Sequence, residues 1–215
     1  MDMTDDRWIV HADAHCIVVN KPSGLPSVPG RAAHVQDCAA SRVQALWPDA
    51  RVVHRLDMDT SGLLLFARGL DVQRELSALF EKRRIQKGYT ALVSGTPNPT
   101  SGQMDWPLSA NWPQRPRQQV DLMHGKAALT HYEVVDEAPG FPVTVSRLRL
   151  RPVTGRSHQI RVHLQALGHP ILGDPLYAPP EVRALSPRLC LHACRLELTH
   201  PGTGVSWVLE SPDPF

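Results

Sequence analysis

Apolar positions along the chain come in short clusters separated by polar and turn-forming residues, a pattern typical of strands rather than of long helices. Clusters at 8–10 and 16–19 flank a polar turn at 13–15 and predict two adjacent strands. Further apolar segments of strand length predict strands at 63–68, 87–95, 130–135, 143–150, 189–198 and 205–209. The chain is therefore expected to be rich in strands.

Three segments have the features of helices instead. Residues 35–47 are followed by a proline, which ends a helix. Residues 71–83 begin at Asp71, whose side chain is suited to cap a helix. Residues 156–167 are followed by a glycine, a common stop signal. By contrast, residues 101–126 are rich in Pro, Gln and Trp and are expected to be mostly loop.

The last predicted helix has two distinct faces. At about 100° per residue, three apolar side chains share the face suited to a core: Ile160, Leu164 and Leu167. Three polar side chains share another face: His158, Arg161 and Gln165. Many short strands with a few helices predict an α+β fold, with a mixed, mostly antiparallel sheet and a few flanking helices. We expect a single catalytic domain over residues 1–215.

Composition narrows the class of protein. The 215 residues are 42% hydrophobic and 20% charged, which suits a globular body. No apolar run approaches the roughly 20 residues of a membrane helix, and the first residues, MDMTDDRW, lack the apolar core of a signal peptide. The four cysteines are then expected to be reduced thiols. These features favour a cytoplasmic protein without a membrane partner.

The distribution of charge says more than the net charge of +2. Residues 138–173 form a stretch of 36 residues without a carboxylate. Its basic and imidazole side chains are Arg147, Arg149, Arg151, Arg156, Arg161, His158, His163 and His169. Smaller clusters lie at Lys82-Arg83-Arg84 with Lys87, and at Arg115 and Arg117. Any one cluster is compatible with a solvated face, but together they indicate a surface that binds phosphate groups.

The densest polar segment is His54-Arg55-Leu56-Asp57-Met58-Asp59-Thr60-Ser61-Gly62. An ordinary turn with side-chain capping explains its second half, including Asp59. It does not explain His54, Arg55 and Asp57, which stand where strand residues are expected. These three residues are therefore the first candidates for chemistry.

This segment resembles the catalytic motif of the RluA-type pseudouridine synthases. Other blocks resemble motifs of that family in the same order: Asn20-Lys21-Pro22-Ser23-Gly24-Leu25, Lys87-Gly88-Tyr89-Thr90-Ala91-Leu92-Val93, Gly155-Arg156-Ser157-His158-Gln159-Ile160-Arg161-Val162-His163, Gly168-His169-Pro170-Ile171-Leu172-Gly173-Asp174 with Tyr177, Leu191-His192-Ala193, and His200-Pro201. The resemblance extends from about residue 13 to residue 212. It implies the pseudouridine synthase fold, with an RNA-binding cleft across the sheet.

Within the family, the chain is most similar to the dual-specificity member, which modifies a tRNA anticodon stem-loop and a similar 23S rRNA hairpin. Two segments carry this likeness, Ser27-Val28-Pro29-Gly30-Arg31 and Asn111-Trp112-Pro113. Many relatives carry an N-terminal S4 domain, for which we expect no room because the first strand begins near Trp8. The implied partners are tRNA and 23S rRNA stem-loops, and the protein is expected to be a monomer. A member of the same family with a different rRNA or tRNA target is the alternative.

The implied reaction breaks the N1–C1′ bond of uridine, rotates the base and rejoins it through C5. It involves no redox change and no energy input, so no cofactor and no metal are expected. Asp57 is the implied catalytic carboxylate, as nucleophile at C1′ or C6 or as base at C2′. The target base must leave its stack before it reacts.

The resemblance also assigns roles to other residues. Arg161 is implied to pair with Asp57 and favour its charged form. Tyr89 is implied to stack on the target base or to remove the proton from C5, and Arg55 to fill the space that the flipped nucleotide leaves. Further RNA contacts are expected at His54, Arg156, His158, Lys82, Arg83 and Arg84.

A zinc nucleobase deaminase is a second class of enzyme to weigh. His131-Tyr132-Glu133 matches the H-x-E part of its signature, and Cys190 and Cys194 follow. The signature requires two residues between its cysteines and a proline directly before them. Here three residues separate the cysteines, and Pro187 is not adjacent. The spacing therefore argues against zinc.

Two other classes of protein share features with this chain. Asp59-Thr60-Ser61-Gly62 is similar to an aspartic protease loop, but it has an extra residue and no second copy to pair with. A non-catalytic RNA-binding or ribosome-assembly protein would have the same basic stretches. Asp57 argues against that class, because a carboxylate facing phosphates is unfavourable unless it takes part in chemistry.

Overall fold

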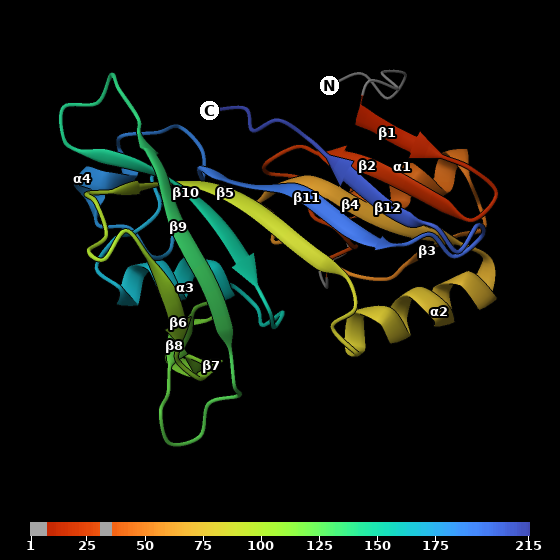
Figure 1. Ribbon diagram of the computed structural model, residues 1–215, viewed down its shortest axis with the longest axis horizontal. Helices are drawn as coiled ribbons and strands as arrows, with labels where there is room; N and C mark the ends of the chain where they lie inside the picture. The colour runs from red at the N-terminus through yellow and green to blue at the C-terminus, as the bar shows by residue number, and fades with distance from the viewer. Residues whose placement is uncertain (1–7, 31–35) are drawn as a thin grey trace. The chain divides into compact units, whose positions relative to one another are not determined.

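The computed structural model describes residues 8–30 and 36–215. The chain forms two compact units (Figure 1). The first unit contains the described chain up to Gln86 together with Ala193–Asp213, and the second contains Lys87–His192 and Pro214–Phe215. Among the described residues, no helix combines the length and the apolar character that a membrane crossing requires.

The first unit is a sheet with strand order β1-β2-β4-β11, in which β3 pairs with β4 and β12 with β11. The pairs β1–β2, β2–β4, β3–β4 and β11–β12 are antiparallel. The strands are β1 (Ile9–Ala12), β2 (Cys16–Lys21), β3 (Ala50–Val52), β4 (Ser61–Arg68), β11 (Leu191–Thr199) and β12 (Ser206–Glu210). Its helices are α1 (Ala39–Leu46) and α2 (Gly69–Glu81).

Strand β4 is the centre of this unit. Seven of its eight residues are buried, so its apolar side chains fill both faces of the sheet rather than alternating with polar ones. On one face Leu63 and Leu65 share a core with Val18 of β2 and Leu76 of α2. The continuous apolar run that predicts this strand thus reflects cover on both sides.

The second unit is an antiparallel sheet of order β5-β10-β9-β6, with β7 and β8 as a separate hairpin. The strands are β5 (Gln86–Ser94), β6 (Ser101–Asp105), β7 (Leu108–Ala110), β8 (Gln118–Val120), β9 (Leu129–Glu137) and β10 (Val145–Pro152). A 3-10 turn, η2 (Trp112–Gln114), lies between β7 and β8, and the helices are α3 (Gln159–Ala166) and α4 (Pro180–Arg183). Alternation in β10 buries Leu148 and Leu150 and turns Arg149 and Arg151 outward.

The predicted fold class, a mixed and mostly antiparallel sheet with few helices, is confirmed. The segment at residues 101–126, predicted to be mostly loop, also contains three short strands that the sequence did not predict, β6, β7 and β8. Only Met104 of β6 is buried, so that strand has no apolar alternation to reveal it. It is held instead by backbone pairing with β9, a partner distant in sequence.

The helix boundaries differ from those predicted. Asp71 does not cap α2; the helix begins two residues earlier, and Asp71 lies in its first turn. Helix α3 is shorter than predicted, because His158 adopts a left-handed conformation (φ 54°) and precedes the first helical residue. Helix α1 spans Ala39–Leu46, and residue 35 of its predicted range lies outside the described residues.

Candidate active site

Asp57 lies in an irregular segment between β3 and β4, and the backbone on each side of it is held by hydrogen bonds. On one side, Leu56 N–H donates to Ser27 Oγ (3.0 Å) and Ser27 Oγ donates to Leu56 O (2.7 Å). On the other side, Met58 O accepts from Gly24 N–H (2.9 Å) and from Lys21 Nζ (2.9 Å). The half-buried carboxylate therefore projects from a backbone that is anchored at both neighbours.

Lys21 is the main support of this segment. Its side chain is 0% exposed, and its Nζ also donates to Pro22 O (2.9 Å) and Leu25 O (2.7 Å). A buried ammonium is tolerated only when hydrogen bonds replace its water. The block at residues 20–25 thus serves to hold the Asp57 segment, a role that its sequence did not reveal.

His54 and Arg55 differ in their surroundings. His54 Nε2 accepts a hydrogen bond from Leu65 N–H (2.9 Å), and its ring stacks on Phe80 with centroids 4.5 Å apart. His54 therefore ties the segment to β4 and α2, and its expected RNA contact stays a prediction. Arg55 is exposed, as a side chain that enters RNA must be.

The turn predicted in the second half of the polar segment is shorter than expected, because Ser61 and Gly62 already belong to β4. Thr60 N–H donates to Asp57 O (3.1 Å), and Ser23 Oγ donates to Asp59 O (2.6 Å). Gly62 has φ +114°, and a Cβ there would overlap the backbone of Ala193 in β11. Glycine is thus required for the close approach of two strands as well as for its conformation.

In the second unit, Arg161 forms a buried bidentate ion pair. Its side chain is 2% exposed, and its Nε and Nη2 donate to Asp174 Oδ2 (2.8 Å) and Oδ1 (2.7 Å). Asp174 is 0% exposed and also accepts from the backbone N–H groups of Leu176 (2.8 Å) and Tyr177 (3.1 Å). The guanidinium carbon lies 5.1 Å from the centroid of the Tyr177 ring.

The role of Asp174 was not evident from the sequence, although this residue ends the block at residues 168–174. The sequence did contain one signal: Asp174 is the first acid after the acid-free stretch at residues 138–173. That stretch contains Arg161, which lies on a predicted helix and so needs a partner in a fixed position. Asp57 belongs to the first unit and Arg161 to the second. The ion pair between them stays a prediction.

Tyr177 also organises the residues around it. Its hydroxyl lies 2.7 Å from His158 Nδ1 and accepts from Gln118 N–H (2.8 Å). These bonds connect the residue that precedes α3 to strand β8. His158 thus has a structural partner, and its expected contact with RNA stays a prediction.

The remaining candidates lie as follows. Tyr89 is half-buried on β5 opposite Leu150 of β10 and packs against the core of the second unit. Arg156 is exposed and its Nε donates to Ala127 O (3.1 Å). Three exposed basic residues directly follow α2 in the first unit: Lys82, Arg83 and Arg84.

Several arginines of the acid-free stretch at residues 138–173 are paired with carboxylates from other parts of the chain. Arg147 lies 3.5 Å from a carboxylate oxygen of Asp136, and Arg149 donates to Glu133 (2.8 Å). Both acids come from β9, the neighbour of β10. With Arg161 paired to Asp174, three of the five arginines have carboxylate partners from outside the stretch. The expected phosphate surface therefore depends more on the other basic residues.

Among the described residues, one group could hold a metal ion: His11, Asp13 and His200, whose ligand atoms lie within 4.8 Å of one another. His11 Nε2 and His200 Nε2 lie 2.9 and 2.8 Å from Asp13 Oδ2. His200 Nδ1 accepts from the N–H groups of Gly202 (3.2 Å) and Thr203 (3.3 Å), which favours a proton on Nε2. That tautomer leaves Nε2 no lone pair for a metal, so the group fits a hydrogen-bonded network better.

The residues considered for a deaminase site do not form such a group in the described chain. Glu133 is engaged by Arg149, and Cys190 is buried in the core of the second unit. The zinc reading has no support from this geometry.

Comparisons with known proteins agree with the motifs. The sequence pattern of the family described as RNA pseudouridylate synthase matches residues 15–166. The chain is 50% identical over 212 residues to the dual-specificity RNA pseudouridine synthase RluA of Escherichia coli, covering 98% of this chain and 95% of that protein. The protein of the same name from Haemophilus influenzae is 45% identical over 207 residues, covering 96% and 93%.

Solved structures show the same fold. Human RNA pseudouridylate synthase domain containing 1 has a TM-score of 0.81 at 28% identity, covering 96% of this chain and 83% of that one. Human RNA pseudouridylate synthase domain containing 4 has a TM-score of 0.76 at 26% identity, covering 97% and 89%. The chain therefore belongs to the RluA family and is an RNA pseudouridine synthase.

Proposed function

We propose that this enzyme has dual specificity and converts uridine to pseudouridine in a tRNA anticodon stem-loop and in a similar 23S rRNA hairpin. The observation that carries the proposal is 50% identity over nearly the whole length of a relative whose name states dual specificity. The same name recurs at 50% identity in Pasteurella multocida and at 45% in Haemophilus influenzae. We further propose one catalytic domain that acts as a monomer in the cytoplasm.

Asp57 is the proposed catalytic carboxylate. Its support is the anchored backbone at Leu56 and Met58, which fixes where the carboxylate starts. A group that attacks C1′ or C6, or removes a proton from C2′, must hold its position relative to the ribose to act efficiently. Because the reaction changes no oxidation state and needs no energy input, we propose no cofactor and no metal.

Arg161 and Tyr89 are the proposed partners of Asp57 in catalysis. Asp174 fixes the guanidinium of Arg161 from one side, which orients its remaining N–H groups. The half-buried ring of Tyr89 is suited to stack on a base while its hydroxyl stays polar. Arg55 is proposed to occupy the gap left by the flipped uridine, and His54, Arg156, His158, Lys82, Arg83 and Arg84 to contact the RNA.

The experiment is to incubate the enzyme with cellular RNA from a strain that lacks it and to map the new pseudouridines. New sites in both a tRNA anticodon loop and a 23S rRNA hairpin are expected. New sites in one class of RNA alone would refute dual specificity.

A second measurement tests Asp57. The Asp57→Asn variant should form no pseudouridine while it still binds RNA. The matched control is Asp59→Asn, which lies in the same turn and should lose stability rather than turnover. Substantial turnover by Asp57→Asn would overturn its assignment as the catalytic carboxylate.

A further inference from the structure

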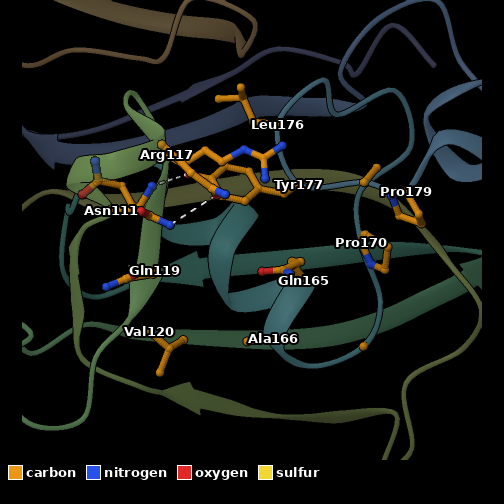
Figure 2. A pocket seen from close by; sticks show the side chains of 14 residues that line it. Asn111, Arg117, Gln119, Val120, Gln165, Ala166, Pro170, Leu176, Tyr177 and Pro179 are labelled. Atoms are coloured by element: carbon orange, nitrogen blue, oxygen red, sulfur yellow. Dashed lines mark hydrogen bonds between the residues drawn. The ribbon is translucent and has the colours of Figure 1, made fainter.

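The second unit contains a hollow of about 730 Å³, and its lining includes none of the proposed catalytic residues Asp57, Tyr89 and Arg161. Its walls come from the β7–β8 hairpin, from the C-terminal end of α3 and from the segment at residues 176–179 (Figure 2). Binding pockets for small organic groups have volumes of about 300–1,000 Å³. The hollow is therefore large enough for a nucleotide.

The hollow is lined by an unusual number of amide side chains. They are Asn111, Gln114, Gln118, Gln119 and Gln165. Figure 2 shows Asn111 and Gln119 on the hairpin side and Gln165 on the helix side of the same hollow. An amide offers a donor and an acceptor side by side, which matches the edge of a nucleobase.

The charge of the hollow has the sign that RNA requires. Among the described residues that line the hollow, Arg117 is the one with a charged side chain, and none is a carboxylate. The nearest acid in sequence, Asp121, turns its Oδ1 to the backbone N–H groups of Met123 (3.2 Å) and His124 (2.9 Å). A phosphate can therefore approach Arg117 without facing a lining carboxylate.

An aromatic platform adjoins the hollow. Trp112 begins the 3-10 turn η2, between the lining residues Asn111 and Gln114, and its side chain is 66% exposed. Arg115 lies over its ring, with the guanidinium carbon 3.4 Å from the centroid. An ordered and exposed indole suits stacking of an unpaired base.

The wall of the hollow is built before RNA arrives. Strands β7 and β8 pair from Leu108–Val120 to Ala110–Gln118, and Gln118 N–H donates to the Tyr177 hydroxyl (2.8 Å). Asn111 Nδ2 donates to Gln114 Oε1 (3.4 Å), which orders the turn that holds Trp112. A framework fixed in this way reduces the entropy that ligand binding must overcome.

We infer that the hollow and Trp112 form a second RNA-binding site, which takes an unpaired base of the substrate other than the target uridine. Trp112 stacks on that base, the amides of the hollow hydrogen-bond to its edge, and Arg117 contacts a neighbouring phosphate. Recognition of unpaired RNA bases commonly combines stacking with hydrogen bonds to base edges. The inference rests on the RNA substrate of the family and not on the proposed pair of targets.

The first test compares two RNAs whose target uridine is replaced by cytidine, so that no turnover occurs. One is a stem-loop that the enzyme modifies, and the other is a short oligonucleotide with only the nucleotides that flank the target. Trp112→Ala should raise the Kd for the stem-loop about five- to 150-fold and leave that for the oligonucleotide unchanged. An unchanged Kd for the stem-loop, or equal losses on both RNAs, would overturn the inference.

The second test locates the base by chemical probing of its Watson–Crick and Hoogsteen edges. The wild-type enzyme should protect one unpaired base besides the target, and the double variant Gln119→Ala/Gln165→Ala should lose that protection. The control is Gln103→Ala, an exposed glutamine of the same unit on β6 and outside the hollow. Protection that survives in the double variant, or that is lost equally in the control, would refute recognition by these amides.

Both tests use any RNA that the enzyme modifies, so they remain valid if dual specificity fails. Thermal unfolding of each variant separates lost recognition from lost folding. Because Trp112, Gln119 and Gln165 are all exposed, their variants should have wild-type Tm values.

Discussion

Replacing Asp174 with asparagine perturbs the most deeply buried ion pair of the second unit. The carboxylate accepts four hydrogen bonds, of which two come from Arg161 and two from the backbone. An amide keeps one acceptor oxygen and brings its NH₂ group against an N–H donor, whichever way it turns. Asp174→Asn therefore removes the charge that compensates Arg161 and also places two donors face to face.

The magnitude follows from the burial of both partners, which are 2% and 0% exposed. Breaking a buried ion pair by removing one partner costs about 3–5 kcal/mol, because the other charge stays buried without compensation. For a chain of about this length, 1 kcal/mol shifts Tm by about 2–4 °C. Asp174→Asn is thus expected to lower Tm by about 6–20 °C.

The assay is a double-mutant cycle followed by thermal and urea unfolding. Arg161→Met should cost a similar amount, because it leaves the Asp174 carboxylate buried without its cation. The double variant should cost less than the sum of the two single variants, since it leaves no uncompensated charge. If the loss of unfolding free energy in the double variant equals the sum of the two single losses to within about 0.5 kcal/mol, the coupling is refuted. A near-normal Tm for either single variant would refute the buried pair.

Four further variants test other parts of the structure. Lys21→Met removes one donor from each of three backbone carbonyls, of which Met58 O keeps the Gly24 N–H. The variant should lose about 3 kcal/mol or more of stability, measured by unfolding, and should react more slowly, measured in single-turnover assays. Arg83→Ala should lower the slope of log K against log salt by about 0.7–0.9 if this exposed side chain contacts a phosphate; an unchanged slope contradicts that. Arg55→Ala should slow a structured stem-loop more than an unstructured oligonucleotide, because only the former must unstack its uridine. Burial by itself would raise the pKa of the Asp13 carboxyl. Hydrogen bonds from His11, from the Cys16 and His15 amides and from His200 outweigh burial and hold this pKa below its ordinary value. The stabilisation from the ionised carboxylate is present above about pH 4 and is lost as the pH falls further. Asp13→Asn should therefore have a lower Tm than the wild type at pH 7, and the difference between the two Tm values should be smaller at pH 3.

Much of the candidate site was visible in the sequence because it lies in short continuous blocks. Asp57 stands in a polar segment where strand residues are expected, and the turn after it carries its own signals. Most strands were also predictable, because burial of one or both faces leaves an apolar pattern in neighbouring residues. Strand β4, for example, can be predicted from its own apolar run without knowing which strands pair with it.

The structure alone decided which groups support the site. Lys21 is a buried ion whose acceptors include a carbonyl 37 residues away, and Arg161 is compensated by an acid 13 residues away. Strand β6 is held by hydrogen bonds to β9, and the side-chain pattern of β6 does not indicate this pairing. Apolar periodicity is a local property of the chain, whereas the pairing of charges, backbone groups and hollow walls depends on contacts that only the folded chain makes.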